Sequence, residues 1–129
     1  MKRFTKRWSL RWLMISVALP GCGQKQAPVP ADPDQGRAVL LAALTAWKDG
    51  GQCDQLKERR PPIIVNDPDW IAGRRLKRFQ LADGHEYHGS QLRCAATLTF
   101  EGENGVTTEK KVTFLIDTSP VLVIVRGDM

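Results

Sequence analysis

Apolar and polar residues alternate in two neighbouring segments of the second half of the chain. From Leu92 to Phe100 every even-numbered residue is apolar, and Val112, Phe114 and Ile116 repeat this spacing after the glycine-containing segment 102–105. A period of two places one face of a β-strand against a core. The pattern therefore predicts two strands joined by a turn.

A third strand is predicted at Val121–Val125, where every residue is apolar. Such a run is typical of a strand that is central in a sheet or covered on both faces. A three-residue turn would pair Asp117 with Val121. In that register Leu115, Val121 and Val123 share the face that points away from the core.

The face that carries these three residues needs shielding, because one helix covers only one face of a sheet. The sequence leaves three ways open: the apolar segment Ile63–Val65, a partner, or a curl of the sheet. If a partner covers this face, then Leu115, Val121 and Val123 are candidate contacts for it.

An amphipathic helix is predicted from about Gln35 to Asp49, with Asp34 as its N-cap. Its apolar residues recur at the spacing of one buried helix face: Leu40, Ala43, Leu44 and Trp47. Gly50 and Gly51 follow immediately and end the helix.

Short elements are predicted between this helix and the alternating segments. Cys53–Arg59 is expected to form a helical turn that ends before two prolines, and Ile63–Val65 a strand or a packed loop. Another helical turn has Asp67 as its cap and Pro68 in its first turn. A strand over Arg74–Leu81 follows.

Residues 1–21 have the order of a bacterial secretory signal, with a basic segment, an apolar segment and a small residue before a cleavage site. The basic residues are Lys2, Arg3, Lys6, Arg7 and Arg11, and the apolar run covers 12–19. This run forms roughly 12 Å of helix, whereas about 20 residues span a bilayer. We therefore do not expect a permanent transmembrane anchor here.

The segment Leu19-Pro20-Gly21-Cys22 resembles a lipobox, the site at which bacterial lipoproteins are cleaved and lipidated. The resemblance implies cleavage after Gly21 and a diacylglyceryl group on Cys22, which would anchor the mature chain to a membrane. Gly23 in place of aspartate implies the outer rather than the inner membrane. A plain secretory signal, or a cytosolic protein with a fortuitous N-terminus, remains the alternative.

The chain has 19 Lys and Arg residues against 14 Asp and Glu residues, a formal net charge of +5. The whole excess lies in the predicted signal, because no acidic residue precedes Asp32. Removal of residues 1–21 leaves a neutral chain, which has no electrostatic reason to bind nucleic acid. The next segment, 22–33, is rich in proline and is predicted to be an extended tether before a single domain at 34–129.

Two cysteines remain once Cys22 carries a lipid. An exported protein lies in a compartment that permits disulfides, so Cys53 and Cys94 are a candidate pair. Sequence spacing alone does not bring two Cα atoms within bonding distance. The sequence therefore leaves open a disulfide or two free thiols.

Few residues in the chain suggest catalysis. His85 and His88 flank Glu86, but they are the only histidines, and a polar loop between strands explains them as well as a metal site does. Asp67 and Asp69 are explained by helix capping. We expect no catalytic residue, cofactor or metal. The alternative is a pocket between helix and sheet in which these histidines and carboxylates converge.

Basic residues are concentrated at one place in the mature chain. They are Arg74, Arg75, Lys77 and Arg78, with Lys57, Arg59 and Arg60 nearby in sequence. This concentration suits contact with acidic lipid headgroups or an anionic polymer of the envelope. A solvated strand surface balanced by the acids of neighbouring turns is the other interpretation.

Several segments together resemble small lipoproteins that recur in planctomycete bacteria. The similarity covers about Arg37–Arg126 and rests on Ala46–Gly50, Pro61–Trp70, Gly73 and Thr118–Pro120. It implies an α+β fold of the cystatin-like or NTF2-like type, with one N-terminal amphipathic helix packed on a curved antiparallel sheet of about four strands. It implies no established activity.

The sequence thus favours a lipid-anchored, non-catalytic protein of the cell envelope. In a bacterium with two membranes this protein would face the periplasm. Its small domain would bind another envelope protein or an envelope polymer. The alternative function is a small ligand-binding or enzymatic pocket between the helix and the sheet.

Overall fold

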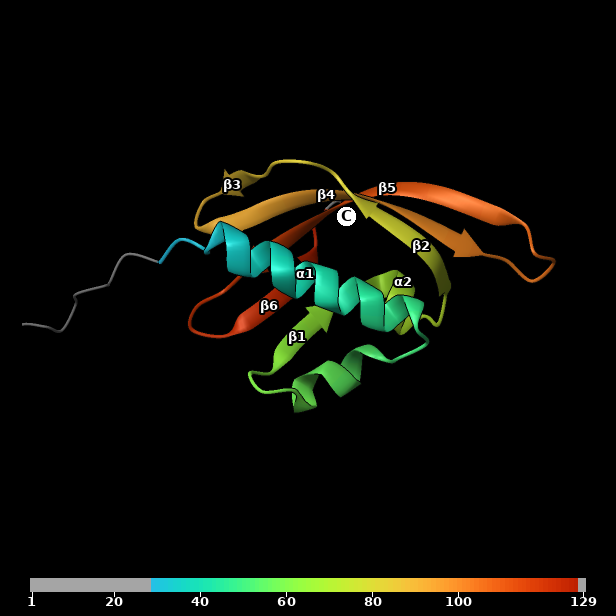
Figure 1. The fold of residues 1–129 in the computed structure, drawn as a ribbon, viewed down its shortest axis with the longest axis horizontal. Helices are drawn as coiled ribbons and strands as arrows, with labels where there is room; N and C mark the ends of the chain where they lie inside the picture. Colours follow the sequence, from blue (N-terminus) through green and yellow to red (C-terminus); the bar gives the residue numbers. More distant parts are fainter. Residues whose placement is uncertain (1–28, 128–129) are drawn as a thin grey trace, which may run out of the picture.

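The computed structural model describes residues 29–127. They form an α+β fold in which a mixed, six-stranded sheet curls into a half-barrel. One long helix, α1 (Pro33–Lys48), lies across the sheet (Figure 1). The broad α+β prediction is confirmed.

The chain passes through two short helical elements and six strands after α1. The helical elements are η1 (Cys53–Glu58) and α2 (Pro68–Ile71). The strands are β1 (Ile63–Asn66), β2 (Arg75–Leu81), β3 (Glu86–His88), β4 (Gln91–Glu101), β5 (Thr107–Asp117) and β6 (Leu122–Arg126). The order across the sheet is β1-β6-β5-β4-β2, and β3 pairs with the start of β4.

The predicted helix is present and begins two residues earlier than expected, at Pro33, so the prediction of Asp34 as its N-cap is wrong: Asp32 holds the cap position and Asp34 lies in the first turn. Proline suits the first turn because an N–H group at this position would have no hydrogen-bond partner within the helix, so its absence costs nothing. The expected apolar residues are all buried: Leu40, Ala43, Leu44 and Trp47. Gly36 lets the helix approach the sheet closely, since an added Cβ would stand 2.7 Å from the Leu92 side chain.

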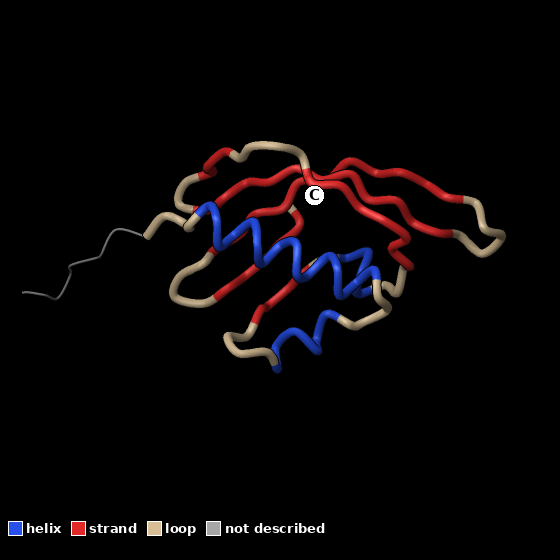
Figure 2. The backbone as a smooth tube through the Cα atoms, in the orientation of Figure 1, coloured by secondary structure: helices blue, strands red, loops and turns tan. Residues whose placement is uncertain are grey.

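The two alternating segments form the predicted antiparallel hairpin of β4 and β5. Their register runs from Leu92 opposite Ile116 to Glu101 opposite Thr107. The even-numbered residues of β4 from Leu92 to Phe100 and of β5 from Val112 to Ile116 are buried, as the period of two predicted. Figure 2 shows the tip of this hairpin extending beyond the end of α1.

The expectation of about four antiparallel strands is wrong. Ile63–Asn66 joins the sheet as β1 and runs parallel to β6. This parallel pairing is available because the whole chain from α2 to β5 forms the crossover between the two strands. Since β1 flanks β6 on the side away from β5, the apolar run of β6 is central in the sheet, as predicted.

The register between β5 and β6 differs from the expected one. Asp117 lies opposite Val123, not Val121. The difference is two residues, which preserves the face of every side chain. Leu115 and Val123 therefore do share the outer face, while Val121 lies just before the strand.

The packed part of the chain begins at Ala31, three residues before the expected start at Asp34. Ala31 is buried, its N–H donates to the Ser90 carbonyl at 2.8 Å, and its carbonyl accepts from the Tyr87 hydroxyl at 2.9 Å. The predicted signal 1–21, Cys22 and most of the predicted tether lie outside the described residues. In the described part of the chain no helix is long and apolar enough to cross a bilayer.

Candidate functional site

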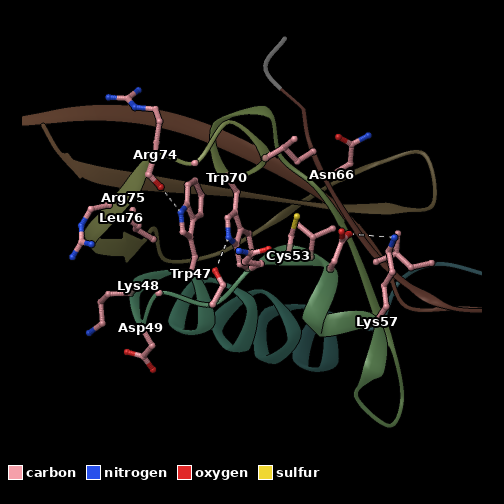
Figure 3. Close-up of a pocket in the computed structure, with 18 residues that line it drawn as sticks. Trp47, Lys48, Asp49, Cys53, Lys57, Asn66, Trp70, Arg74, Arg75 and Leu76 are labelled. Atoms are coloured by element: carbon pink, nitrogen blue, oxygen red, sulfur yellow. Dashed lines mark hydrogen bonds and ion pairs between the residues drawn. The ribbon is translucent and has the colours of Figure 1, made fainter. Parts of the chain in front are cut away.

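A cleft of about 830 Å³ opens at the C-terminal end of α1 (Figure 3). One wall is formed by the end of α1 and the loop that leads to η1, and another by the segment from α2 to β2. A third side is formed by Ile64, Val65 and Asn66 of β1. The cleft therefore collects segments that are far apart in the sequence.

Two stacked indoles stand between these walls. The rings of Trp47 and Trp70 are parallel, with centroids 5.1 Å apart and an interplanar angle of 1°. Trp47 Nε1 donates to the Arg74 carbonyl, and Trp70 Nε1 donates to the Gly51 carbonyl, both at 2.9 Å. Because both indoles are buried and both N–H groups are bonded, the pair fixes the walls of the cleft. The prediction of Trp70 as a core residue is confirmed.

A glycine makes the corner between α2 and β2. Gly73 has φ of 89°, and its N–H donates to the Trp70 carbonyl at 2.9 Å. A side chain at this position would be strained in the left-handed region. Gly73 thus turns the chain so that Arg74 lies beside Trp47 on the cleft wall.

A buried ion pair holds the end of β1 to the end of β6. Arg126 Nη2 donates to Asp67 Oδ1 at 2.8 Å and to Asp69 Oδ2 at 2.7 Å. The side chains of Arg126 and Asp67 are 2% and 1% exposed. Asp67 also accepts from the backbone N–H groups of Asp69 and Trp70 at 2.8 and 3.3 Å, which confirms it as the cap of α2.

The ion pair shifts the pKa values of Asp69 and Arg126 in opposite directions. Burial raises the pKa of Asp69, but hydrogen bonds from Arg126 and from Lys110, at 3.2 Å, outweigh burial and leave this pKa below its ordinary value. Burial lowers the pKa of Arg126, but hydrogen bonds and charge from Asp69 and Asp67 outweigh burial and raise it. At pH 7 Asp69 is therefore deprotonated and Arg126 protonated, and neither group exchanges a proton readily at that pH, which is unsuited to general acid–base catalysis.

The rim of the cleft carries more positive than negative side chains. The charged residues that line it are Lys48, Lys57, Arg74 and Arg75 with Asp49 and Asp54. Two of the four cations have acidic partners beyond the lining: Arg74 pairs with Asp69 at 3.7 Å, and Arg75 with Glu101 at 3.9 Å. Acidic residues therefore neutralise part of the cluster of basic residues that the sequence analysis identified.

The two cysteines are free thiols in the structure, the second of the alternatives that the sequence left open. Cys94 lies in β4 near Arg37, whereas Cys53 begins η1 beyond the other end of α1. From Arg37 to Lys48 the helix rises about 16 Å, far more than the roughly 7 Å that a disulfide allows between Cα atoms. Burial, and for Cys53 also the charge of Asp54, raises the pKa of each thiol, so neither is a thiolate at pH 7.

The two histidines do not meet the two aspartates. His85 and His88 are exposed beside the start of β4, where the His85 ring makes an edge contact with Tyr87 at 5.7 Å. Asp69 instead meets Lys110, which lies opposite Leu98. From Leu92 to Leu98 a strand rises roughly 20 Å. These four side chains therefore do not converge, as the alternative of a catalytic or ligand-binding pocket required, and the described residues contain no group of three or more potential metal ligands.

The outer face of the sheet carries an apolar stripe, which we define as Ile64, Leu115, Val123 and Val125. Ile64 is exposed and the other three are half-buried. Val121, at the end of this stripe, is 45% exposed. The segment Ile63–Val65 does not shield this face, because it extends the sheet instead of covering it.

Three comparisons with known proteins bear on the identity of the site. A scan against protein-family models, a search of curated proteins and a search of solved structures each gave no match to this chain. The functional argument therefore depends on the residues of the cleft and on where it lies relative to the predicted anchor. Sequence reasoning missed the cleft because its walls come from α1, β1, α2 and β2.

Proposed function

We propose that this protein is a lipid-anchored component of the cell envelope whose domain binds another envelope protein or polymer without catalysing a reaction. The observation that carries the proposal is the position of the cleft relative to the point where the chain enters the domain. The N-terminal lipobox resemblance supplies the anchor, on Cys22. Gly23 favours the outer membrane, with the domain in the periplasm.

The chain enters the domain at the N-terminal end of α1, where Ala31 is bonded to Ser90. The cleft lies at the other end of this helix (Figure 3). The 16 residues of α1 span about 24 Å. A chain tethered through Cys22 would thus present the cleft away from the point of attachment, which is the arrangement that suits capture of a partner.

The chemistry of the cleft also supports binding. Asp69 next to the wall is fixed in ion pairs, and the Cys53 thiol has a raised pKa. The indole N–H groups are already bonded to backbone carbonyls. The groups left for a partner are charged side chains of the rim, such as Lys48 and Asp49, and these recognise a ligand without activating it.

A small ligand in the same cleft is the second candidate. Its volume of about 830 Å³ lies within the range of small-molecule sites. The finer assignment to a cystatin-like or NTF2-like fold also remains our proposal. A single long helix on a strongly curled sheet supports it, and the parallel pairing of β1 with β6 is a departure from the antiparallel sheet that we expected.

Mass spectrometry of the membrane fraction tests the anchor. We expect a mature chain that begins at an acylated Cys22. Cys22→Ser should leave the signal uncleaved or release the protein, whereas the matched control Cys53→Ser should remain acylated and membrane-bound. A soluble wild-type chain without a lipid would contradict the proposal.

A further inference from the structure

We propose that the end of the domain at which the chain enters rests on the phospholipid surface that holds the lipid of Cys22. This inference rests on the proposed anchor and adds a second contact between the protein and the same membrane. Three features carry it: exposed apolar side chains around the entry point, two exposed arginines on a neighbouring loop, and the short length of chain between Cys22 and Ala31.

Four segments meet at this end, where β5 stops and β6 begins. Ala31 is bonded there to Ser90 in the β3–β4 turn. The Asp32 N–H donates to the Thr118 hydroxyl in the β5–β6 turn at 2.9 Å. The loop 59–62 leaves the sheet beside this turn, because β1 and β6 are parallel and begin opposite each other (Figure 2). We define the entry face as the surface of segments 29–32, 59–62, 87–90 and 118–121.

Exposed apolar side chains surround the entry point. Val29 lies two residues before Ala31, and the Tyr87 hydroxyl donates to the Ala31 carbonyl at 2.9 Å, which holds the Tyr87 ring beside the chain. Val121 lies in the same turn as Thr118. Val29, Tyr87 and Val121 are all exposed. Apolar side chains gathered at one place favour a contact surface, and tyrosine suits the boundary between lipid and water because its ring is apolar and its hydroxyl polar.

Two arginines lie on the same face. Arg59 and Arg60 are exposed, and no ion pair within residues 29–127 involves either of them. Asp32 is the single acid of the entry face, and Glu58 and Asp117 border it. Guanidinium groups bind phosphate oxygens well, so these arginines can meet phospholipid headgroups while the apolar side chains enter the layer beneath.

The chain before the domain is short. Cys22 precedes Ala31 by nine residues, which reach at most about 30 Å when fully extended. A domain held within this distance has a high effective concentration at the membrane, so a few weak contacts suffice to keep it there. The cleft lies at the other end of α1, whose 16 residues span about 24 Å. Contact through the entry face would thus leave the cleft open to the periplasm.

A protein partner or a second copy of this chain fits the entry face less well. Each side of a stable protein interface contributes about 800 Å². Val29, Tyr87 and Val121 together offer much less apolar surface than that, because even a fully exposed aromatic side chain offers only about 150–250 Å². A tethered domain needs no such area to stay on a bilayer, since the lipid of Cys22 already holds it there.

NMR spectroscopy of the acylated full chain in phospholipid nanodiscs tests the contact. The bilayer contains phosphatidylethanolamine and phosphatidylglycerol, with a gadolinium chelate on some headgroups that broadens the amide signals of nearby residues. We expect the strongest broadening at 87–90 and 118–121, and little at Gly51 and Gly73 in the cleft. Uniform broadening, or the strongest broadening at the cleft, would overturn the proposal.

A matched pair of variants separates contact from mere tethering, which would also keep the entry face near the bilayer. Val121→Glu should lower the ratio of docked to undocked domain about tenfold, because its carboxylate would have to lose water. Val106→Glu adds the same charge to another exposed side chain, at the tip of the β4–β5 hairpin, and should change the ratio by less than about twofold. Equal broadening in the two variants would overturn the contact.

A second pair of variants tests the arginines in the same nanodiscs. Arg59→Gln/Arg60→Gln should weaken docking about fivefold, because two cations are lost beside anionic headgroups. The control Lys77→Gln/Arg78→Gln removes the same charge from exposed residues of β2 and should leave docking within about twofold. Equal losses in the two pairs would overturn the assigned role of Arg59 and Arg60.

The outcomes separate this inference from the proposed function. If Cys22 is acylated and the entry face is broadened no more than the cleft, the anchor stands and the inference fails. If Cys22 carries no lipid, the anchor fails, and the inference that rests on it fails with it.

Discussion

The two borders of the sheet differ in how they meet solvent. β2 carries Arg75, Lys77 and Arg78, all exposed, and its register with β4 shifts between Leu76 and Arg78. Charges and bulges on a border strand oppose the addition of another strand. β1 has four residues, Ile-Ile-Val-Asn, with no charge and no register shift against β6.

The difference shows that the two borders are protected in different ways. Charges and a register shift protect β2, whereas η1 lies along the side of β1 that faces away from β6 (Figure 1). A helical segment laid along a border strand opposes the addition of another strand, as charges do. β1 is also held at its end, because Asp67, the next residue, is bonded to Arg126 at the end of β6 in a buried ion pair.

The largest effect should come from removal of the pair that fixes β1. Arg126→Ala leaves Asp67 buried without its cation, which we expect to lower the free energy of unfolding by about 3–5 kcal/mol. Arg78→Ala, on the exposed border strand, should change it by less than about 0.5 kcal/mol. Chemical denaturation measures both. A loss of similar size in the two variants would remove the distinction between the borders.

A smaller effect is expected from acid. The pKa of Asp69 is below its ordinary value in the folded chain, so this carboxyl contributes stability above its unfolded pKa of about 3.9 and loses it as pH falls through the folded value. The free energy of unfolding should therefore decline below about pH 4. Asp69→Asn should flatten that decline in urea titrations at several pH values. An unchanged slope in the variant would contradict the role of the ion pair.

The smallest effect on stability should come from substitutions in the charged border strand, β2. Lys77→Thr/Arg78→Thr should alter the free energy of unfolding by less than about 0.5 kcal/mol, because both side chains are exposed. It should nevertheless cause association that rises with protein concentration, since the border loses two charges. Analytical ultracentrifugation measures this. A variant that stays monomeric would show that the bulge alone protects β2.

Local patterns predicted the elements well. The alternation of apolar residues predicted β4 and β5, and the helical spacing of Leu40 and Trp47 predicted α1. Both patterns depend only on residues that are close together in the chain. Asp67 was identified as a cap for the same reason. These features needed no knowledge of the distant parts of the chain.

Long-range features were missed. Arg126 lies 59 residues from Asp67, and nothing local marks it as the partner of a buried carboxylate. One signal was present: Leu122, Ile124 and Arg126 share a period of two, which places the arginine on the core face. The parallel pairing of β1 with β6, and hence the cleft, likewise depends on segments that meet only after folding.

Amide hydrogen exchange at Ile63–Asn66 tests the central claim, that β1 is a fixed strand held to β6 and covered on its other side by η1. We predict slow exchange of the amides that are directed to β6. Exchange of these amides as rapid as that of an unstructured peptide would mean that β1 is not fixed, and would contradict the account.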